Sequence, residues 1–157
     1  MIKLIVATDK NNLIGNVDKM PWRIKEEFEH FRNTTISHSL LFGRTTFLGL
    51  PGKLDKRTIY VLSEQTLDNC ITIHNETELK NLFAKFKTNN EVLFIAGGKS
   101  IYEKYFEYAD ELLISRVDGD YQGNVYLNLN LSNYEVIKKQ KFEKFVVETY
   151  KRIQKTH

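Results

Sequence analysis

Short, continuously apolar runs of strand length recur along this chain, and segments with helical spacing lie between them. The runs are Ile2–Thr8, Leu40–Gly43, Thr58–Ser63, Ile71–Ile73, Val92–Ala96 and Glu111–Val117. The helical segments are residues 24–35, the residues just after Gly43, the segment from Asn75 to Phe86, and the residues after Gly98. Strands that are apolar throughout are buried on both faces. Their alternation with helices therefore predicts an α/β domain with a largely parallel sheet covered on both sides.

The end of the chain has a different pattern. Two segments, Tyr134–Gln140 and Phe145–Ile153, alternate between apolar and polar residues, which predicts an antiparallel hairpin at one edge of the sheet. Two other segments show neither pattern, and we expect loops there. Residues 9–21 are polar and rich in asparagine, and residues 118–133 contain Gly119 and Gly123. Long loops in a compact domain are often functional, for example as lids over a site.

The composition restricts the class of protein. A chain of 157 residues that is 41% hydrophobic and 27% charged is predicted to form one globular domain, residues 1–157. No apolar run approaches the roughly 18 residues of a membrane-spanning helix. The first residues resemble a buried strand rather than a secretory signal. The single cysteine, Cys70, suits a reducing compartment, so we expect a cytoplasmic protein.

Charge and metal-ligand patterns exclude further classes of partner. The net charge of +3 comes from 23 basic and 20 acidic residues, and this surplus is too small and too dispersed to indicate nucleic-acid binding. The four histidines, His30, His38, His74 and His157, do not have the spacing of metal ligands. We therefore expect neither a nucleic acid, nor a membrane, nor a bound metal.

One carboxylate is placed unusually. The segment Met20-Pro21-Trp22 leads into a short charged helix in which Ile24, Phe28 and Phe31 share one stripe. Glu27 lies about 40° from Phe31, at the rim of this apolar face. A carboxylate there loses water, so it needs a partner or its pKa rises. Such groups transfer protons or bind cations. The alternative is that Glu27 extends past the rim to water.

Two strand-to-helix junctions contain glycine and could hold phosphates. They are Leu41–Phe47, with Gly43 followed by Arg44, and Phe94–Tyr102, with a Gly-Gly pair. Glycine lets the backbone approach a ligand closely, arginine offers a planar fork of donors, and helix N-termini attract anions. Glycine also occurs at such turns for steric reasons alone. However, both junctions lie at the carboxyl ends of predicted parallel strands, where a ligand with several phosphates could bridge them. No complete dinucleotide-binding or P-loop motif is present.

In their order along the chain, these pieces resemble bacterial dihydrofolate reductases over essentially the whole length. The matching pieces are Ile14-Gly15, Met20-Pro21-Trp22 with the acid five residues later, Gly43–Phe47, Arg57 ahead of Ile59–Ser63, Ile95–Gly98 with Ile101-Tyr102, and Val147–Arg152. The resemblance implies a three-layer fold. Its centre would be a mostly parallel eight-stranded sheet with a C-terminal antiparallel hairpin, and about four helices would cover the two faces. It also implies a monomer.

The resemblance implies a specific reaction. A hydride would pass from NADPH to carbon 6 of 7,8-dihydrofolate and a proton to nitrogen 5, giving 5,6,7,8-tetrahydrofolate for one-carbon metabolism and thymidylate synthesis. The protein would position the reactants and exclude water, while the cofactor carries the chemistry. Dihydrofolate and antifolate-type small molecules would be its ligands.

For the substrate, the resemblance gives each residue a role. Glu27 would bind the 2-amino and N3 edge of the pterin and promote protonation, Ser115 would orient this acid, and Met20 and Trp22 would complete the catalytic group. Many bacterial members have aspartate at the position of Glu27. The remaining substrate contacts would come from Ile5, Val6, Ala7, Phe28, Phe31, Leu50, Leu54, Ala96 and Tyr102, with the carbonyls of Ile5 and Ala96 accepting from the pterin amino group. Arg57 would pair with the α-carboxylate of the glutamate tail. Without the resemblance, Arg57 would be interpreted as an ordinary surface charge.

The resemblance also implies where NADPH binds. The nicotinamide end would contact Ala7, Ile14, Gly15 and Met20. The phosphates and the adenosine would contact Gly43, Arg44, Thr45, Thr46, Leu62, Ser63, Glu64, Ala96, Gly97, Gly98, Lys99, Ser100, Ile101 and Tyr102. In the family a cis peptide bond joins the two glycines, and we predict one between Gly97 and Gly98.

Three positions depart from the family pattern. Glu64 stands where the adenosine 2′-phosphate would lie, and a carboxylate there is repulsive. Either Glu64 turns away, or Arg44 compensates, or the preference for NADPH over NADH is weakened. Asn124 replaces an acid of the late loop, which removes hydrogen bonds between loops that stabilise a closed lid. Lys99 occupies a position that varies in the family.

Other functions compete with this interpretation. The reductase domain of riboflavin biosynthesis shares the fold and the cofactor, but it does not predict the acid after Pro-Trp or Arg57, and it is usually fused to a zinc deaminase. A non-enzymatic nucleotide-binding module would use the same phosphate-facing junctions. Such a module gives no reason for a single acid facing an apolar pocket. A basic nucleic-acid binder is a third alternative.

Overall fold

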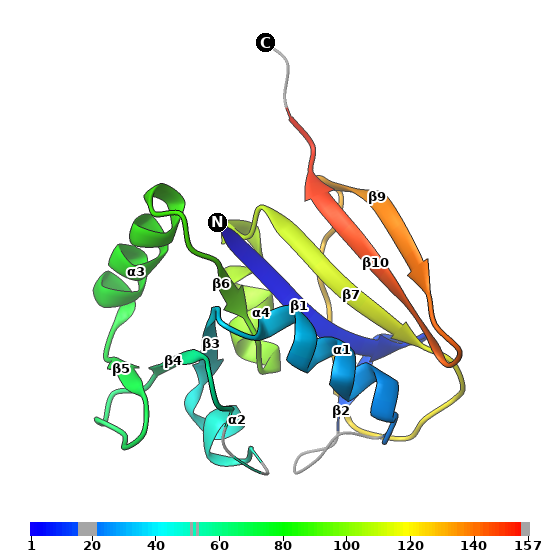
Figure 1. Cartoon of the computed structure of the whole chain (residues 1–157), viewed down its shortest axis with the longest axis horizontal. Helices are drawn as coiled ribbons and strands as arrows, with labels where there is room; N and C mark the ends of the chain where they lie inside the picture. Colours follow the sequence, from blue (N-terminus) through cyan, green and yellow to red (C-terminus); the bar gives the residue numbers. More distant parts are fainter. Residues whose placement is uncertain (16–21, 51, 53, 155–157) are drawn as a thin grey trace.

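The computed structural model of the chain describes residues 1–15, 22–50, 52 and 54–154. An eight-stranded sheet forms its centre (Figure 1). The strand order is β5 (Ile71–Ile73), β4 (Thr58–Leu62), β3 (Ser39–Gly43), β6 (Leu93–Ile95), β1 (Ile2–Asp9), β7 (Glu111–Val117), β10 (Phe145–Arg152) and β9 (Tyr134–Lys141). Neighbouring strands from β5 to β7 are parallel, and β10 is antiparallel to both β7 and β9. The predicted mostly parallel sheet with a C-terminal hairpin is confirmed.

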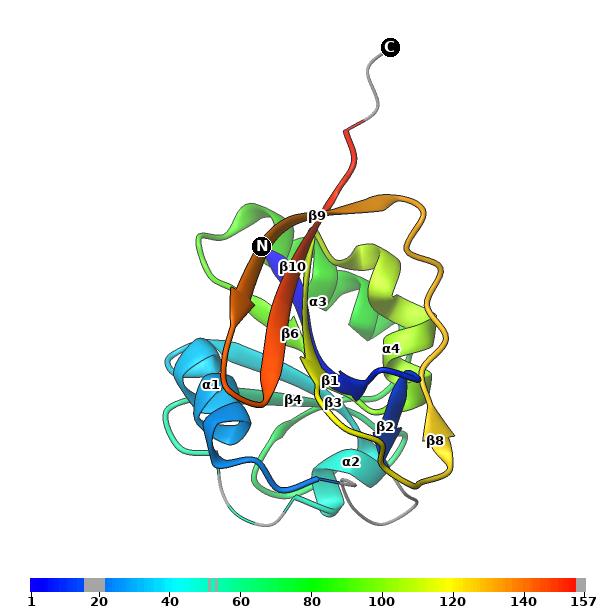
Figure 2. The same ribbon diagram turned by 90° about the vertical axis from the view of Figure 1, so that its right-hand side faces the viewer.

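Helices cover both faces of the sheet. They are α1 (Lys25–Thr35), α2 (Arg44–Leu48), α3 (Glu76–Thr88) and α4 (Lys99–Tyr105), with a short 3-10 turn η1 (Phe106–Tyr108) after α4. Figure 2 shows α1 on one side of the sheet and α3 and α4 on the other. In the part of the chain that the structure describes, no helix is long and apolar enough to cross a membrane.

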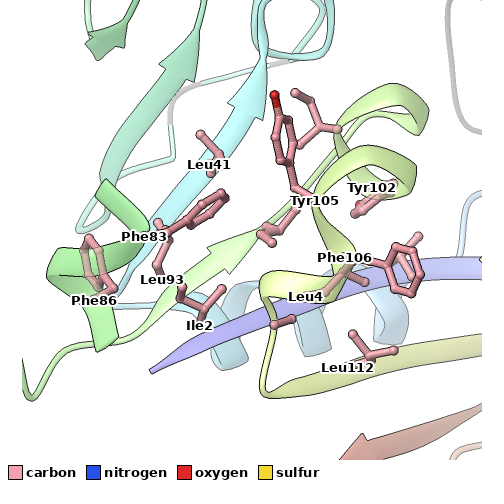
Figure 3. Packing of buried hydrophobic residues seen from close by; sticks show 14 of the residues in the cluster. Ile2, Leu4, Leu41, Phe83, Phe86, Leu93, Tyr102, Tyr105, Phe106 and Leu112 are labelled. Atoms are coloured by element: carbon pink, nitrogen blue, oxygen red, sulfur yellow. The ribbon is translucent and has the colours of Figure 1, made fainter. Parts of the chain in front are cut away.

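The core is divided between these two faces because successive residues of a strand point in opposite directions. On the face of α3 and α4, Leu4, Leu41 and Leu112 pack against Phe83 and Phe106 (Figure 3). On the face of α1, the buried cluster consists of Ile5, Leu40, Phe42, Phe94 and Ala96. Strands that supply both clusters must be apolar throughout, which explains the uninterrupted runs in the sequence.

The two segments expected to be loops contain a strand pair that the sequence did not predict. β2 (Leu13–Gly15) pairs antiparallel with β8 (Val125–Tyr126), and the Leu127 N–H donates to the Asn12 carbonyl over 2.8 Å. The expectation of loops throughout both segments was therefore wrong. Strands this short leave no period in the sequence, and their partners are more than a hundred residues apart along the chain.

The sheet divides beside β1, and this division positions the site. β6 pairs with β1 only over Ile2–Leu4, whereas β7 accompanies β1 from Lys3 to Asp9. The carboxyl-terminal half of β1 is therefore bordered by a strand on one side. The strand order also reverses here, because β6 and β7 leave β1 in opposite directions. A crevice at such a point is where open α/β sheets bind ligands.

Candidate active site

We call the region beyond Leu4, where β6 no longer pairs with β1, the crevice, and Tyr102 bridges it. Its hydroxyl, on α4, donates a hydrogen bond of 2.8 Å to the Ile5 carbonyl on β1. On the other side, the Gly43 N–H donates to the Gly97 carbonyl over 2.8 Å, which joins the ends of β3 and β6. The carboxyl ends of three strands and the N-termini of α2 and α4 thus meet at one place.

Glu27 on α1 is buried on the crevice side of the sheet. Its residue is 6% exposed, and burial raises the pKa of its carboxyl to about 7. The alternative that Glu27 extends past the helix rim to water is therefore wrong. The pKa of the Tyr102 hydroxyl is raised, first by burial and then by the charge of Glu27, so the two groups influence each other. A buried carboxyl of this kind is half-protonated near neutral pH and can hold a proton for a reaction.

Ser115 lies on the same face of the sheet as α1. It is buried on β7, where it is paired with Ala7 of β1 and Val147 of β10. Leu113 and Val117, two residues to either side, belong to the clusters on this face. Among the described residues, no hydrogen bond links the Ser115 hydroxyl to Glu27, and burial alone accounts for the raised pKa of the acid. The orienting role of Ser115 remains a prediction.

Apolar side chains form a wall next to Glu27. Phe31, Leu50 and Leu54 pack against the cluster on the α1 face that contains Ile5 and Ala96. Phe28, in contrast, is 41% exposed at the surface of α1. Val6 does not join this group, because its side chain packs into the core on the opposite face. Only the backbone of Val6 can therefore line the site.

Arg57 lies at the outer end of this wall. A pocket of about 410 Å³ is lined by Arg32, Ile36, Leu50, Gly52, Leu54, Asp55, Lys56 and Arg57. The guanidinium of Arg57 donates to the Thr35 hydroxyl over 3.1 Å and to the carbonyls of Asp55 and Arg32 over 2.6 and 2.5 Å. Burial and the nearby Arg32 lower its pKa. These three bonds use three of the roughly five N–H donors of a guanidinium, so the side chain is held in place with donors left for a carboxylate.

Thr35 is a positioning residue that the sequence did not identify. It is fully buried at the end of α1, and its hydroxyl also donates to the Phe31 carbonyl over 2.8 Å. A threonine bonded to the preceding helical turn is common at helix ends. Nothing in the sequence connects it with an arginine 22 positions later.

The glycines at the two junctions leave no room for side chains. The peptide bond between Gly97 and Gly98 is cis, as predicted. A methyl group built on Gly98 would lie 2.7 Å from the Thr46 hydroxyl, and one on Gly43 would lie 3.0 Å from Ile101. α2 and α4 begin directly after Gly43 and Gly98, and neither has a side-chain cap among the described residues. Their first N–H groups therefore have no side-chain acceptor in the described part of the chain and are available to a bound anion.

The other predicted contacts of the phosphates lie around these glycines. Thr45, Lys99 and Ser100 are exposed in the first turns of α2 and α4, whereas Ile101 is buried beneath Gly43. At the end of β4, the Ser63 hydroxyl donates to the Gln65 carbonyl over 2.8 Å. The Arg44 guanidinium contacts the Gln65 amide oxygen over 3.5 Å, and Glu64 is exposed beside them. Leu62 packs against the buried cluster on the face of α3 and α4.

At the expected nicotinamide end, Ala7 is buried at the end of β1 and Ile14 lies on β2, packed against the core of the α3 face. Gly15 ends β2. The contacts predicted for Met20 lie outside the described residues. Trp22 is buried, and its ring meets the ring of Tyr121 edge-on, with centroids 5.4 Å apart. Tyr121 was not predicted, because a lone aromatic residue in a loop gives no signal.

Comparison with known proteins agrees with this geometry. A family model described as dihydrofolate reductase matches residues 1–154. Dihydrofolate reductase from Mycoplasma pneumoniae is 37% identical over 161 residues, which cover 98% of this chain and 99% of that protein. The enzyme from Ureaplasma parvum is 32% identical and covers 96% of each chain. Among solved structures, dihydrofolate reductase from Enterococcus faecalis, complexed with NADP(H) and RAB-propyl, has a TM-score of 0.87 at 24% identity, over 98% of this chain and 97% of that chain. On the family match and these identities, the chain belongs to the dihydrofolate reductase family of oxidoreductases.

Proposed function

We propose that this protein reduces 7,8-dihydrofolate to 5,6,7,8-tetrahydrofolate with NADPH, and so supplies one-carbon metabolism and thymidylate synthesis. The single observation that carries the proposal is Glu27, a carboxyl buried next to the crevice with a pKa raised to about 7. An acid in this state is protonated in a large share of molecules near neutral pH, which suits the delivery of a proton.

The pterin would lie between Glu27 and the carboxyl-terminal half of β1. A carboxyl group offers two oxygens to the 2-amino and N3 edge of an amino-pyrimidine. The Ile5 carbonyl already accepts from Tyr102, but a carbonyl has two lone pairs and can accept from the pterin amino group as well. Glu27 would then promote protonation of nitrogen 5, directly or through a water molecule. Burial of Trp22 beside this position supports the exclusion of bulk water.

The apolar wall and Arg57 fit the rest of the substrate. Phe31, Leu50 and Leu54 would contact the benzoyl ring, and Arg57, held by Thr35 and two carbonyls, would bind the α-carboxylate of the glutamate tail. Because these bonds already hold the guanidinium in place, less conformational entropy is lost when the carboxylate binds. The same pocket would bind antifolate-type small molecules.

The crevice also fits a dinucleotide. The cofactor, when bound, supplies the hydride. The backbone of Gly97 and Gly98, the uncapped N-termini of α2 and α4, and Arg44 would hold its phosphates. The relative that is complexed with NADP(H) supports this choice of cofactor. We expect a monomer in the cytoplasm.

The direct test is to follow NADPH oxidation by the purified protein with dihydrofolate, with NADH in parallel. Turnover with NADPH supports the proposal. No turnover with either cofactor, from protein shown to be folded by circular dichroism, would contradict it. A nucleotide-binding module would then be favoured if the protein still binds NADPH.

A further inference from the structure

Arg116 lies near the carboxyl end of β7, and the proposed function gives it no role. Its side chain points to the face of α3 and α4, because the adjacent residues Ser115 and Val117 face α1. The guanidinium donates to four oxygen atoms: Oε1 of Glu148 over 2.9 Å, the hydroxyl of Tyr150 over 3.3 Å, the hydroxyl of Thr8 over 3.1 Å and the side-chain oxygen of Asn12 over 3.1 Å. These bonds use most of the roughly five N–H donors of a guanidinium, so its orientation is fixed.

One half of this network anchors Arg116 to the sheet. Glu148 and Tyr150 lie on β10, which pairs with β7 along its whole length. The Tyr150 hydroxyl also donates to Oε1 of Glu148 over 3.0 Å, and the Glu148 side chain is 16% exposed. Burial tends to raise the pKa of this carboxyl, but the bonds from Arg116 and Tyr150 lower it below its ordinary value. The ion pair therefore persists at neutral pH and holds the guanidinium on the sheet.

The other half of the network holds the turn after β1. Asn12 has a left-handed backbone with a φ of 66°, a conformation that asparagine adopts more readily than most residues. Its N–H donates to the Asp9 carbonyl over 3.2 Å, and its carbonyl accepts from the Leu127 N–H over 2.8 Å, directly after β8. These two backbone bonds tie the turn to β1 and β8. The bond from Arg116 to the Asn12 side chain adds a tie to β7.

β2 begins directly after Asn12, and its position depends on this turn. Its pairing with β8 is short and irregular, so few hydrogen bonds of its own hold it (Figure 2). Leu13 is fully buried, and its N–H donates to the Asp9 carboxylate over 2.9 Å. Ile14 and Gly15, which we expect to contact the nicotinamide, come next. A displacement of Asn12 therefore reaches these contacts almost directly.

We propose that Arg116 is a positioning residue for the nicotinamide ring of the cofactor. It acts through Asn12, which fixes the start of β2, and it needs no contact with the cofactor itself. This inference rests on the proposed function, because it assumes that the nicotinamide lies against Ile14 and Gly15. Arg116 then contributes to binding of the nicotinamide half of NADPH. It does not contribute to binding of the adenosine half, which the proposed function assigns to the N-termini of α2 and α4.

The test compares two ligands that differ in the nicotinamide ring alone. NADPH carries the ring, and 2′-phospho-ADP-ribose is the same molecule without it. We would measure the dissociation constants of both by calorimetry for wild type and variants. We expect R116A to bind NADPH about three- to thirtyfold more weakly than wild type, and to bind 2′-phospho-ADP-ribose within about twofold of wild type. Equal weakening of both ligands, or weakening of neither, would overturn the proposal.

Variants of Asn12 test whether Arg116 acts through this residue. N12G removes the side-chain oxygen, and glycine adopts a φ of 66° without strain. We expect N12G to weaken NADPH binding as R116A does, and the double variant to bind no more weakly than R116A alone. N12D keeps an oxygen toward Arg116 and should stay within about twofold of wild type. Additive losses in the double variant would overturn the proposal. N12G also gives the answer if R116A does not fold.

Arg152 is the matched control for a merely structural loss. It lies at the other end of β10, and its guanidinium donates to the Ala109 carbonyl and the Tyr134 hydroxyl over 2.9 Å in each case. R152A should lower the urea midpoint of unfolding as R116A does, yet leave the affinity for both ligands unchanged. In turnover, R116A should raise the KM for NADPH and leave the KM for dihydrofolate unchanged. An equal rise in both KM values, or weaker NADPH binding by R152A, would indicate general destabilisation and overturn the proposal.

The positioning role and the proposed reaction can fail separately. Selective weakening of NADPH binding by R116A without reduction of dihydrofolate would leave the positioning role standing and contradict the reaction. Reduction of dihydrofolate without such selective weakening would contradict the positioning role alone.

Discussion

The hydroxyl of Tyr102 on α4 donates to the backbone carbonyl of Ile5 on β1 over 2.8 Å, across the crevice where the sheet divides. The pairing of β1 with β6 ends at Leu4. Beyond that point, this bond connects β1 to α4, the helix that follows β6. It also holds in place the Ile5 carbonyl, which is expected to accept a hydrogen bond from the pterin amino group. The bond is buried, so its loss has a measurable cost.

Replacing Tyr102 by phenylalanine removes this donor and leaves the Ile5 carbonyl without it. We expect the Y102F variant to lose about 1–3 kcal/mol of unfolding free energy, measured by urea denaturation. Y126F removes a hydroxyl from a tyrosine that is 46% exposed and should change stability little. Equal stability of Y102F and wild type would show that water replaces the hydroxyl at no cost.

Replacing Glu27 by glutamine should abolish most turnover. Glutamine keeps the size and a hydrogen-bonding edge but cannot transfer a proton, so we expect kcat with NADPH and dihydrofolate to fall about 100- to 10,000-fold. NADPH affinity, measured by fluorescence titration, should stay the same. E26Q, at the exposed neighbouring position, is the matched control. A fully active E27Q variant would remove Glu27 from the mechanism.

The same substitution has a pH-dependent effect on stability. The folded-state pKa of Glu27, about 7, lies above the ordinary glutamate pKa of 4.5, so the native state binds the proton more tightly than the unfolded state. The stability that this protonation contributes is fully present below pH 4.5 and is lost as the pH rises through 7. Burying the charged form then costs about 3 kcal/mol. E27Q should therefore exceed wild type in stability at pH 8, and this advantage should shrink toward pH 4.5 in urea titrations.

Gly98 should not tolerate alanine. The added methyl would lie 2.7 Å from the Thr46 hydroxyl and would push α2 away from the start of α4. Because both helix N-termini face the proposed phosphate site, we expect G98A to weaken NADPH binding by at least about tenfold. G52A is the matched control, because nothing lies within 4 Å of its added methyl. Unchanged affinity in G98A would place the phosphates elsewhere.

Arg57 should affect the substrate and not the cofactor. R57K keeps the charge but loses the bidentate fork, so we expect the KM for dihydrofolate to rise about 10- to 100-fold with little change in kcat. T35V, which removes the bond to Nε, should give a smaller rise in the same direction. K80M, on exposed α3 surface, should change neither constant. A fall in kcat without a change in KM would argue against binding of the tail carboxylate.

The sequence by itself determined the order of the elements. Continuous apolar runs marked the strands of the main sheet, from Ile2–Thr8 onward, because strands buried on both faces must be apolar at every position. The local signals were also sufficient for the helix that Asn75 caps, where its side chain accepts from the Glu78 N–H over 3.0 Å. In return, the Glu78 carboxylate accepts from the backbone N–H of His74, the residue before this cap.

Only the tertiary structure decided how residues far apart in the sequence meet. The burial of Glu27 depends on the neighbours that the sheet provides, and the helical wheel left it open whether the side chain reaches water. The contact of Thr35 with Arg57, the pairing of β2 with β8 and the bond from Arg116 to Asn12 join segments whose local patterns are unrelated. Local periodicity records which face of an element is buried, whereas the partner on that face is set by the packing of the whole chain.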